Sequence, residues 1–478
     1  METKMNTKST QKATLKGAIT TGKIRNYNEI IEFLDAHWTT NTNDKELQCV
    51  TQLDKALGKP SQKVDIITVA GTNGKSLTIN FTTQLLREEG FKVGCFYTPH
   101  ILTYNERIAI NNETVSNKTF TELGNEIINA VESAGTNPNS YEILLIMALH
   151  YFAQNKVDVA IIEAPVGFAV NPVSICNPKI VAITRIVSDI TLPDGQVPQK
   201  TFNTILNIVK SGSYVVSADQ SKLHLQTILE KIKIKGAKWT MPIRKLAQLN
   251  YPFEQLHGRC AALAERIGDT YANTFANKET TIISKSLIIR QKGQRGRPTL
   301  EAKRHAELHP KKTIDQFWKE TENTLPARFQ LLDKEKPSIL LDNANNFDAF
   351  KNLLLGIRLL HYQRPLKGLT LVIGCNNPNL DMLEFLKLLR YFFKKTSGQV
   401  IVCPVKSLPY DMGLPSWDIE KVTNDIKNMK IKAKASKNFE EAFETAQKSV
   451  DERHGLVVIT GSSALINKYW QYKEIKKL

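Results

Sequence analysis

The sequence predicts an α/β protein of two units, each a parallel β-sheet with helices on both faces. Short β-branched apolar runs alternate with longer helical stretches along most of the chain. A glycine-rich turn follows one of these runs directly, at residues 71–74. The alternation stops at a polar, basic stretch over 290–312 and then restarts. We therefore expect a larger P-loop unit followed by a smaller, Rossmann-like α/β unit.

The first unit is expected to begin with an amphipathic helix over 26–37. A strand over 66–70 leads into the turn, and the helix after the turn continues to about residue 89, where Gly90 can cap it. The same alternation predicts strands over 92–97, 157–162, 180–184 and 214–216, and helices over 119–133, 141–153, 201–210 and 221–234.

The second unit repeats the pattern on a smaller scale. It is expected to contain strands over 339–341, 369–373, 400–405 and 457–459, and helices up to about 360 and over 380–393. We divide the chain into a basic disordered tail at 1–24, a first unit at 25–312 with the basic insert, and a C-terminal unit at 313–478. The junction is expected near residues 312–324.

Composition limits the class of protein. A chain of 478 residues with 41% hydrophobic and 23% charged residues is typical of a multi-domain globular protein. No apolar run reaches the roughly 18–20 residues of a membrane-spanning helix, so we expect no membrane association. Residues 1–24 lack the apolar core of a signal peptide. The six cysteines contain no CxxC pair, which favours buried thiols in a reducing compartment, and hence a cytoplasmic protein.

The net charge of +17 raises the question of nucleic-acid binding. Much of the excess lies in the tail at 1–24 and in the insert at 290–312, which has no hydrophobic face. A solvated loop is the favoured interpretation of the insert, and attraction of polyanionic substrates is the alternative. We expect no nucleic-acid partner.

The turn after the first buried strand carries the clearest chemical pattern. Glycines at its two ends suit unusual dihedral angles and a close approach of backbone to ligand. Amide groups of such a turn, with the helix start behind it, form a nest for a polyphosphate. A lysine then supplies charge, and a serine hydroxyl can bind Mg²⁺. The predicted nucleotide-binding residues are Gly71, Thr72, Asn73, Gly74, Lys75 and Ser76.

Two details bear on this interpretation. Val69 stands where a full Walker A motif has its first glycine, so the pattern is the shorter G-T-N-G-K-S form. A glycine-rich turn without phosphate is the plain structural alternative. Ligands of parallel sheets bind beyond the carboxyl ends of strands, where the turn, Glu163 and Asp342 are all expected.

Seven segments together resemble one known family. In chain order they are NYNEIIEFL, VAGTNGKS, YTPHILTYNERIAIN, YEILLIMALHYF, DVAIIEAPVG, LPARFQ and DNANN. Their order is similar to that of folylpolyglutamate synthases, relatives of the Mur ligases that include dihydrofolate synthases, and the similarity runs from about residue 26 to 462. The resemblance implies a Mur-ligase-like ATPase domain and a C-terminal glutamate-ligase domain.

The resemblance implies an ATP-dependent ligase that phosphorylates a folate carboxylate and joins it to glutamate. It implies ATP and Mg²⁺ as cofactors, and folate, glutamate and ATP as small-molecule partners of a monomer. Catalytic roles would fall on Lys75, on Lys210 as a carbamylated lysine, and on Arg328 at the γ-phosphate. The other implied residues are Asp342 at the nucleotide, Ser76 and Glu142 at the metal, and Thr98, Pro99, His100 and Arg107 near the folate.

Ordinary structural roles compete with several of these assignments. Glu142 can be an acid favoured by a helix N-terminus, and Lys210 a base favoured by a helix C-terminus. His100 can close a turn after Pro99, and Arg328 can be a surface charge.

The chain also departs from the family pattern. Leu77, Ala169, Asn171, Ile190, Gly258, Asn345 and Phe347 stand where the family has other residues. Ile190 replaces a metal-binding histidine. The departures weaken the second metal and the glutamate end more than the phosphate turn.

Three hypotheses follow. The first is a ligase adding glutamate to folates, with dihydropteroate as a second acceptor. The second is a degenerate, non-catalytic binder of nucleotide or folate, and the third is a Mur-type ligase of cell-wall peptides.

Overall fold

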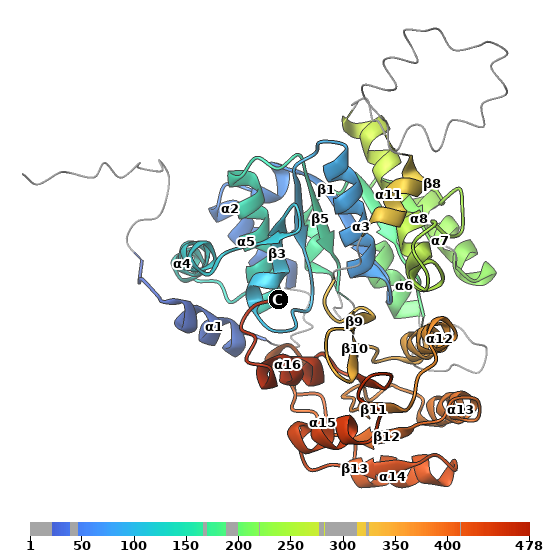
Figure 1. The fold of residues 1–478 in the computed structure, drawn as a ribbon. Helices are drawn as coiled ribbons and strands as arrows, with labels where there is room; N and C mark the ends of the chain where they lie inside the picture. Colours follow the sequence, from blue (N-terminus) through green and yellow to red (C-terminus); the bar gives the residue numbers. More distant parts are fainter. Residues whose placement is uncertain are drawn as a thin grey trace, which may run out of the picture.

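The structure is a computed structural model of the 478-residue chain. It describes residues 22–38, 46–165, 170–187, 199–218, 220–276, 282, 313–321, 325–411 and 413–478. The basic insert at 290–312, nearly all of the tail at 1–24, and the departures at Ala169 and Ile190 lie outside the described residues. Two β-sheets account for the fold, one above the other in Figure 1.

The first sheet has eight strands in the order β4-β3-β2-β5-β1-β6-β7-β8. The six from β2 to β8 are parallel, and the alternation predicted five of them, whereas β8 and the antiparallel edge formed by β3 and β4 were not anticipated by the sequence analysis. The strands are β1 (Asp65–Ala70), β2 (Val93–Phe96), β3 (Ile108–Ile110), β4 (Glu113–Thr114), β5 (Val159–Glu163), β6 (Ile180–Ile183), β7 (Tyr214–Ser217) and β8 (Lys238–Thr240).

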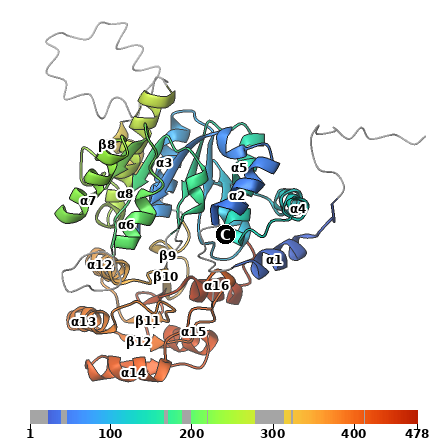
Figure 2. The same cartoon turned by 180° about the vertical axis from the view of Figure 1, so that it is seen from behind.

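Helices cover both faces of this sheet, because its central strands are apolar on both sides (Figures 1 and 2). One face packs against α1 (Tyr27–Ala36), α2 (Glu46–Ala56), α4 (Asn117–Ala134), α5 (Ser140–Gln154), α6 (Gln199–Leu206) and α7 (Lys222–Ile234). The other packs against α3 (Lys75–Glu88), α8 (Phe253–Tyr271) and α11 (Ile314–Glu320). Short turns of helix are η1 (Pro60–Gln62), η2 (Tyr104–Arg107), η3 (Pro172–Ile175) and η4 (Ala272–Ala276).

The second sheet has six strands in the order β13-β12-β11-β14-β10-β9. Five are parallel, and β9 is an antiparallel edge beside β10. The strands are β9 (Gln330–Leu332), β10 (Ser338–Asp342), β11 (Leu369–Ile373), β12 (Gln399–Val402), β13 (Ala433–Ala435) and β14 (Leu456–Thr460). One face packs against α12 (Phe347–Gln363), α13 (Met382–Phe393) and α14 (Ile419–Asn428), the other against α15 (Phe439–Lys448) and α16 (Ser463–Tyr472), while η5 (Pro409–Asp411) follows β12.

Helix α11 bears on the division of the chain, because a boundary at 312/313 would assign it to the second unit. Its Trp318 is fully buried in the core of the first unit, edge-on to Phe81 of α3. The indole Nε1 donates a hydrogen bond to Glu265 of α8 at 2.5 Å. We propose that the boundary lies between α11 and β9.

Replacing Trp318 with alanine is expected to lower the free energy of unfolding by about 3–5 kcal/mol, because it leaves a cavity and removes the donor to Glu265. Trp239 on β8 is 37% exposed, and the same change there should cost under about 1 kcal/mol. Chemical denaturation of both variants measures the difference. Equal costs would contradict the assignment of α11 to the first unit.

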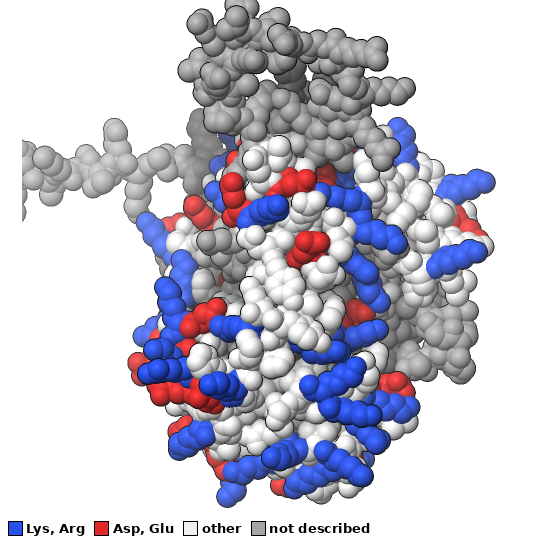
Figure 3. Space-filling view, turned by 45° about the vertical axis from the view of Figure 1, so that its right-hand side comes forward, with Lys and Arg blue, Asp and Glu red and all other residues white. Residues whose placement is uncertain are grey.

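Within the described ranges, no helix is long and apolar enough to cross a membrane. All six cysteines are free thiols, and four of them are buried. In Figure 3, Lys and Arg side chains are more abundant than Asp and Glu on the face shown, so the positive charge is not confined to the tail and the insert.

Candidate active site

The candidate site lies where the carboxyl ends of the two sheets face each other. A cavity of about 880 Å³ opens there, within the size range of small-molecule sites. The first unit contributes the turn after β1, Thr98 after β2, and Glu163 at the end of β5. The second unit contributes Arg328 and the segment from Asp342 to Asn346. The predicted gathering of the phosphate turn, Glu163 and Asp342 beyond strand ends therefore holds.

The two glycines of the turn are required by its geometry. Gly71 has φ = 128° and Gly74 has φ = 88°, both in the region that side chains disfavour. A Cβ atom on Gly71 would lie 2.2 Å from Oγ1 of Thr184, and one on Gly74 would lie 2.9 Å from Sγ of Cys260. Any larger residue would push the turn away from β6 and α8.

Two amides of the turn form hydrogen bonds within the protein, whereas the prediction had the turn's amides binding a polyphosphate. The N–H groups of Thr72 and Asn73 both donate to the carbonyl of Arg185, at 2.9 and 3.3 Å. These bonds pin the turn to the chain after β6 rather than offering both amides to a ligand. The amides of Lys75 and Ser76 begin α3, where a helix provides no acceptor for its first N–H groups. We therefore expect an anion to bind at the start of α3.

Lys75 is nearly buried, with 11% of its side chain exposed. Its Nζ donates to the carbonyls of Gly71 and Thr72, both at 3.1 Å, and lies 3.8 Å from Oε1 of Glu163. Burial lowers the pKa of Lys75, while the negative charge of Glu163 opposes that shift. The ammonium group is thus held over the turn, where it can face phosphate oxygens.

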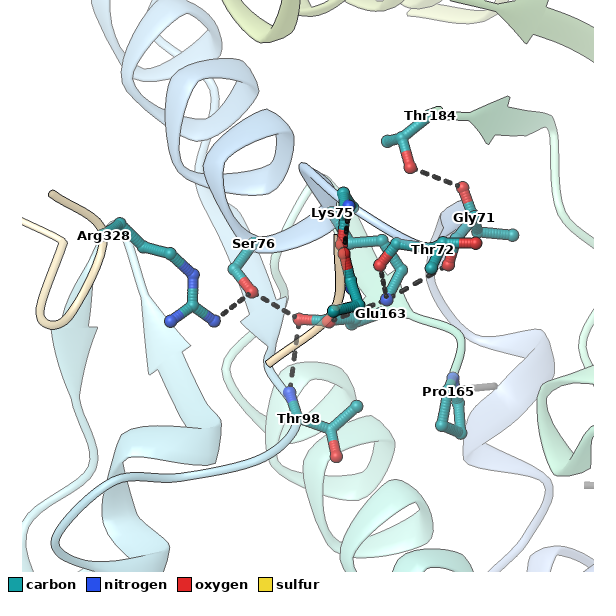
Figure 4. Close-up of polar contacts among 12 residues, drawn as sticks. Gly71, Thr72, Lys75, Ser76, Thr98, Glu163, Pro165, Thr184 and Arg328 are labelled. Atoms are coloured by element: carbon teal, nitrogen blue, oxygen red, sulfur yellow. Dashed lines mark hydrogen bonds and ion pairs between the residues drawn. The ribbon is translucent and has the colours of Figure 1, made fainter. Parts of the chain in front are cut away.

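Ser76, Glu163 and Arg328 form the centre of the site (Figure 4). The Ser76 hydroxyl donates to Oε2 of Glu163 at 3.1 Å and accepts from Nη2 of Arg328 at 3.2 Å. The same Oε2 accepts from the backbone N–H of Thr98 at 3.3 Å. Burial raises the pKa of Glu163, and the charges of Lys75 and Arg328 oppose that shift. The resemblance had placed no metal ligand at Glu163.

Arg328 is presented by a turn in which Ala327 and Phe329 both have positive φ, 57° and 52°. The two carboxylate oxygens of Asp342 accept from the N–H groups of Phe329 at 2.8 Å and Ala344 at 2.9 Å. Burial raises the pKa of Asp342 to about 6. Asp342 lines the cavity, as expected of a nucleotide-binding acid, but its observed contacts hold the turn that carries Arg328.

A second group of residues joins the phosphate turn to the second unit. The side-chain amides of Asn73 and Asn346 exchange two hydrogen bonds, at 3.0 and 2.8 Å. Asn73 also donates to Asp348 at 3.1 Å, and Nη2 of Arg185 pairs with the same carboxylate at 3.1 Å. The start of α12 is therefore bonded directly to the turn that follows β1.

Of the predicted catalytic and metal-binding residues, Glu142 and Lys210 are not brought to the site. Glu142 forms a capping box at the start of α5, where its Oε2 accepts from the N–H of Asn139 at 2.8 Å, and it does not line the cavity. Lys210 lies beyond the end of α6 and just before β7. Because β7 is parallel to β6 and β1, Lys210 is at the amino-terminal edge of the sheet, opposite the phosphate turn. The observed α6 ends at Leu206, so the predicted helix over 201–210 was too long.

The four residues predicted near the folate divide into two pairs. Thr98 and Pro99 line the cavity. His100 and Arg107 are buried behind its wall, with exposures of 9% and 0%, so substrate contact is not what the structure shows for them.

Two departures from the family pattern have visible local roles. Asn171 caps η3 by accepting from Val173 at 3.1 Å and donates to the carbonyl of Pro165 at 2.9 Å. Asn345 lines the cavity, and its carbonyl accepts from the side chain of Asn377 at 3.0 Å.

Sequence reasoning missed the contact of Glu163 with Ser76 and the links through Asn346 and Asp348. The signal for Glu163 was available, since an acid directly after a buried parallel strand faces the ligand edge of the sheet. No comparable signal marked Asn346 or Asp348, because their partners lie more than 250 residues away in the chain.

The donor atoms at the centre fit a hard divalent cation. Ser76 and Glu163 supply a hydroxyl and a carboxylate, the oxygen ligands that Mg²⁺ prefers. Over the part of the chain that the structure describes, no group of three or more His, Cys, Asp or Glu residues could hold a metal alone. A cation here would therefore depend on phosphate oxygens and water for its remaining ligands, as Mg²⁺ bound with a nucleotide does.

Comparison with known proteins finds matches within the family that the sequence resembles. A family model described as "Dihydrofolate synthetase, C-terminal domain" matches residues 326–471. The dihydrofolate synthase/folylpolyglutamate synthase of Bacillus subtilis is 29% identical over 316 residues, which cover 63% of this chain and 69% of that protein.

Two solved structures share the fold along nearly the whole chain. The folylpolyglutamate synthase of Mycobacterium tuberculosis, complexed with ADP, has a TM-score of 0.70 at 18% identity and covers 93% of this chain and 98% of its own. The bifunctional folylpolyglutamate synthase/dihydrofolate synthase of Yersinia pestis, complexed with AMPPNP and an Mn ion, has a TM-score of 0.69 at 19% identity and covers 96% and 100%. The chain is therefore similar in sequence to dihydrofolate and folylpolyglutamate synthases, with a match to the dihydrofolate synthetase C-terminal domain over residues 326–471, and it shares the fold of their solved structures.

Proposed function

We propose that the protein is an ATP-dependent ligase that joins L-glutamate to a folate carboxylate through an acyl phosphate, with dihydropteroate as a second acceptor. The observation that carries the proposal is the convergence of Lys75, Ser76, Glu163 and Arg328 at one end of the cavity. The names of its relatives, which include folylpolyglutamate and dihydrofolate synthases, support the choice of substrates.

Each side chain has a definite task in this reaction. Lys75 and the first amides of α3 hold the triphosphate, and Arg328 meets charge developing on the transferred phosphoryl group. Ser76 and Glu163 would hold Mg²⁺, which neutralises phosphate charge when bound. Asp342 keeps Arg328 in place by accepting from Phe329. Thr98 and Pro99 border the part of the cavity that we assign to the folate.

Two elements of the sequence-based scheme change in this proposal. Glu163 takes the metal-binding role predicted for Glu142, and Lys210 has no role at the reacting groups. A monomeric state, the absence of a nucleic-acid partner and a cytoplasmic location stay predictions from the sequence.

The test has two stages. Calorimetric titration with Mg-ATP measures nucleotide binding, and ADP release is then followed with tetrahydrofolate and glutamate, or with dihydropteroate and glutamate. We expect binding, and release that requires both the acceptor and glutamate. Omitting each substrate in turn is the control for uncoupled ATP hydrolysis.

The alternatives predict other results. Binding of Mg-ATP without release would favour the non-catalytic binder suggested by Ile190 and Asn345. Release that requires a cell-wall peptide precursor instead of a folate would favour the Mur-type ligase. Failure to bind Mg-ATP would refute the assignment of the phosphate turn.

A further inference from the structure

The segment at residues 98–103, which we call the joint segment, lies between β2 and η2 and contacts both units. Its first residue, Thr98, lines the cavity and donates its N–H to Glu163. Its middle residue, Ile101, is 7% exposed and packs in the core of the second unit, on the face covered by α15 and α16. A segment of the first unit is therefore built into the interior of the second.

Two adjacent residues of the first unit hold the joint segment from behind. The Glu106 carboxylate accepts from the N–H groups of Ile101 and Leu102, both at 2.8 Å, and of Thr103 at 2.5 Å. Arg107 donates through Nη1 to Oγ1 of Thr98 at 2.9 Å and through Nε to Nδ1 of His100 at 2.8 Å. Five of the six residues are thus held by one acid and one base.

The second unit holds the same segment from the other side. Tyr410 of η5 donates its hydroxyl to the carbonyl of His100 at 2.9 Å. Asn467 of α16 donates its side-chain amide to the carbonyl of Ile101 at 2.7 Å. The position of the joint segment is therefore defined by the docking of the two units.

The surroundings of Arg107 are unusual for a buried cation. Its side chain is fully buried, and among the described residues it forms no ion pair with a carboxylate. Three aromatic rings surround its guanidinium carbon, Trp38 at 5.0 Å, Tyr104 at 5.7 Å and Tyr410 at 5.6 Å. Burying a charge without an anionic partner is costly, and cation–π contacts offset part of that cost. The buried position of this guanidinium therefore lowers the stability of the fold, and the guanidinium donates to Thr98 and His100.

These contacts form a continuous path into the site. Tyr410 of the second unit contacts the ring of His100 and the guanidinium of Arg107, Arg107 fixes the side chain of Thr98, and the backbone of Thr98 orients the Glu163 carboxylate beside Ser76. We propose that Arg107 and Tyr410 are positioning residues, through which docking of the second unit sets the Glu163 carboxylate for metal binding. The inference rests on the proposed function, in which Ser76 and Glu163 hold the cation.

Two conservative variants test the path. Arg107→Lys keeps a positive charge but loses the fork that reaches Thr98 and His100 together. Tyr410→Phe keeps the ring and removes only the hydroxyl that donates to His100. Because residues that orient a metal ligand contribute about 10–100-fold to metal affinity, we expect Mn²⁺ to bind the ATP complex about tenfold more weakly in Arg107→Lys. A loss of about threefold is expected in Tyr410→Phe, which removes neutral hydrogen bonds to His100 and Ser463, of which only the bond to His100 reaches the joint segment.

The measurement is the free Mn²⁺ signal in electron paramagnetic resonance, titrated at saturating ATP, with the thermal midpoint recorded for each variant. Matched controls come from the surface of the second unit, where Arg358 and Lys395 lie over the ring of Tyr391 at 5.9 and 5.0 Å. Arg358→Lys and Tyr391→Phe change the same groups away from the joint segment, and Mn²⁺ affinity should stay at the wild-type value.

The outcomes separate this inference from the proposed function. Weaker Mn²⁺ binding in both variants, with ATP affinity in the absence of metal unchanged, supports the positioning role. A lowered thermal midpoint with wild-type Mn²⁺ affinity would overturn it, because a merely structural role predicts that result. Wild-type protein that binds Mn²⁺ and ATP but releases no ADP with folate and glutamate would refute the proposed function and leave the path intact.

Discussion

Replacing Glu163 with glutamine is expected to lower folate- and glutamate-dependent ADP release about 10³-fold, the scale of several kcal/mol of lost charge stabilisation. Glutamine keeps the size of the side chain, but its amide cannot offer two anionic oxygens to a cation beside Ser76. The expected change in thermal midpoint is small. The variant relieves a buried carboxylate whose pKa is raised by burial, yet it leaves Lys75 and Arg328 without that negative charge.

The matching change at Glu142 tests which of the two acids, Glu142 or Glu163, binds the metal. Glu142→Gln should leave the Mg²⁺ dependence of ADP release at the wild-type value, because its carboxylate caps α5. Its cost in stability should stay under about 1 kcal/mol, because a glutamine oxygen can still accept from the N–H of Asn139. ADP release as a function of Mg²⁺ concentration measures both variants. A strong loss in Glu142→Gln with little effect in Glu163→Gln would restore the original prediction and refute the assignment made from the structure.

Replacing Lys75 with alanine is expected to lower ADP release by about 10²–10³-fold, because it removes a preorganised cation from the phosphate end of the cavity. The side chain is held by Gly71 and Thr72 in a position that a ligand can reach without reorganising the turn. Arginine should not restore activity, since its planar fork does not match the point charge of an ammonium group. Single-turnover ADP formation, with calorimetric binding of Mg-ATP, measures the chemical and the binding parts separately.

A lysine at the opposite edge of the same sheet provides the control. Lys179 precedes β6, is 43% exposed and lies 3.8 Å from Asp65 at the start of β1. Lys179→Ala should keep the wild-type rate, because it removes an equal charge far from the cavity. A wild-type rate in Lys75→Ala, with the fold retained, would refute the role of the turn in phosphate binding.

The sequence by itself determined which local structures form. Apolar runs of strand length specified the central strands of both sheets but not the peripheral strands β3, β4, β8, β9 and β13. The carboxyl-end rule placed the turn, Glu163 and Asp342 on one edge. Gly71 and Gly74 indicated positive φ, which the structure confirms at 128° and 88°. These features follow from neighbours in the chain, because strand propensity, turn dihedrals and helix starts depend on a few adjacent residues.

The tertiary structure alone decided which side chains meet. Glu142 and Glu163 are both acids beside apolar segments, and only the path of α5 and β5 shows that one caps a helix while the other faces Ser76. Lys210 followed a predicted helix plausibly, but strand direction places it at the far edge of the sheet. Arg107 could have been a substrate contact from its motif, yet Tyr410, about 300 residues later, helps to enclose it. Contacts of this kind depend on how two separately folded sheets dock, and no local pattern in a single sequence encodes that geometry.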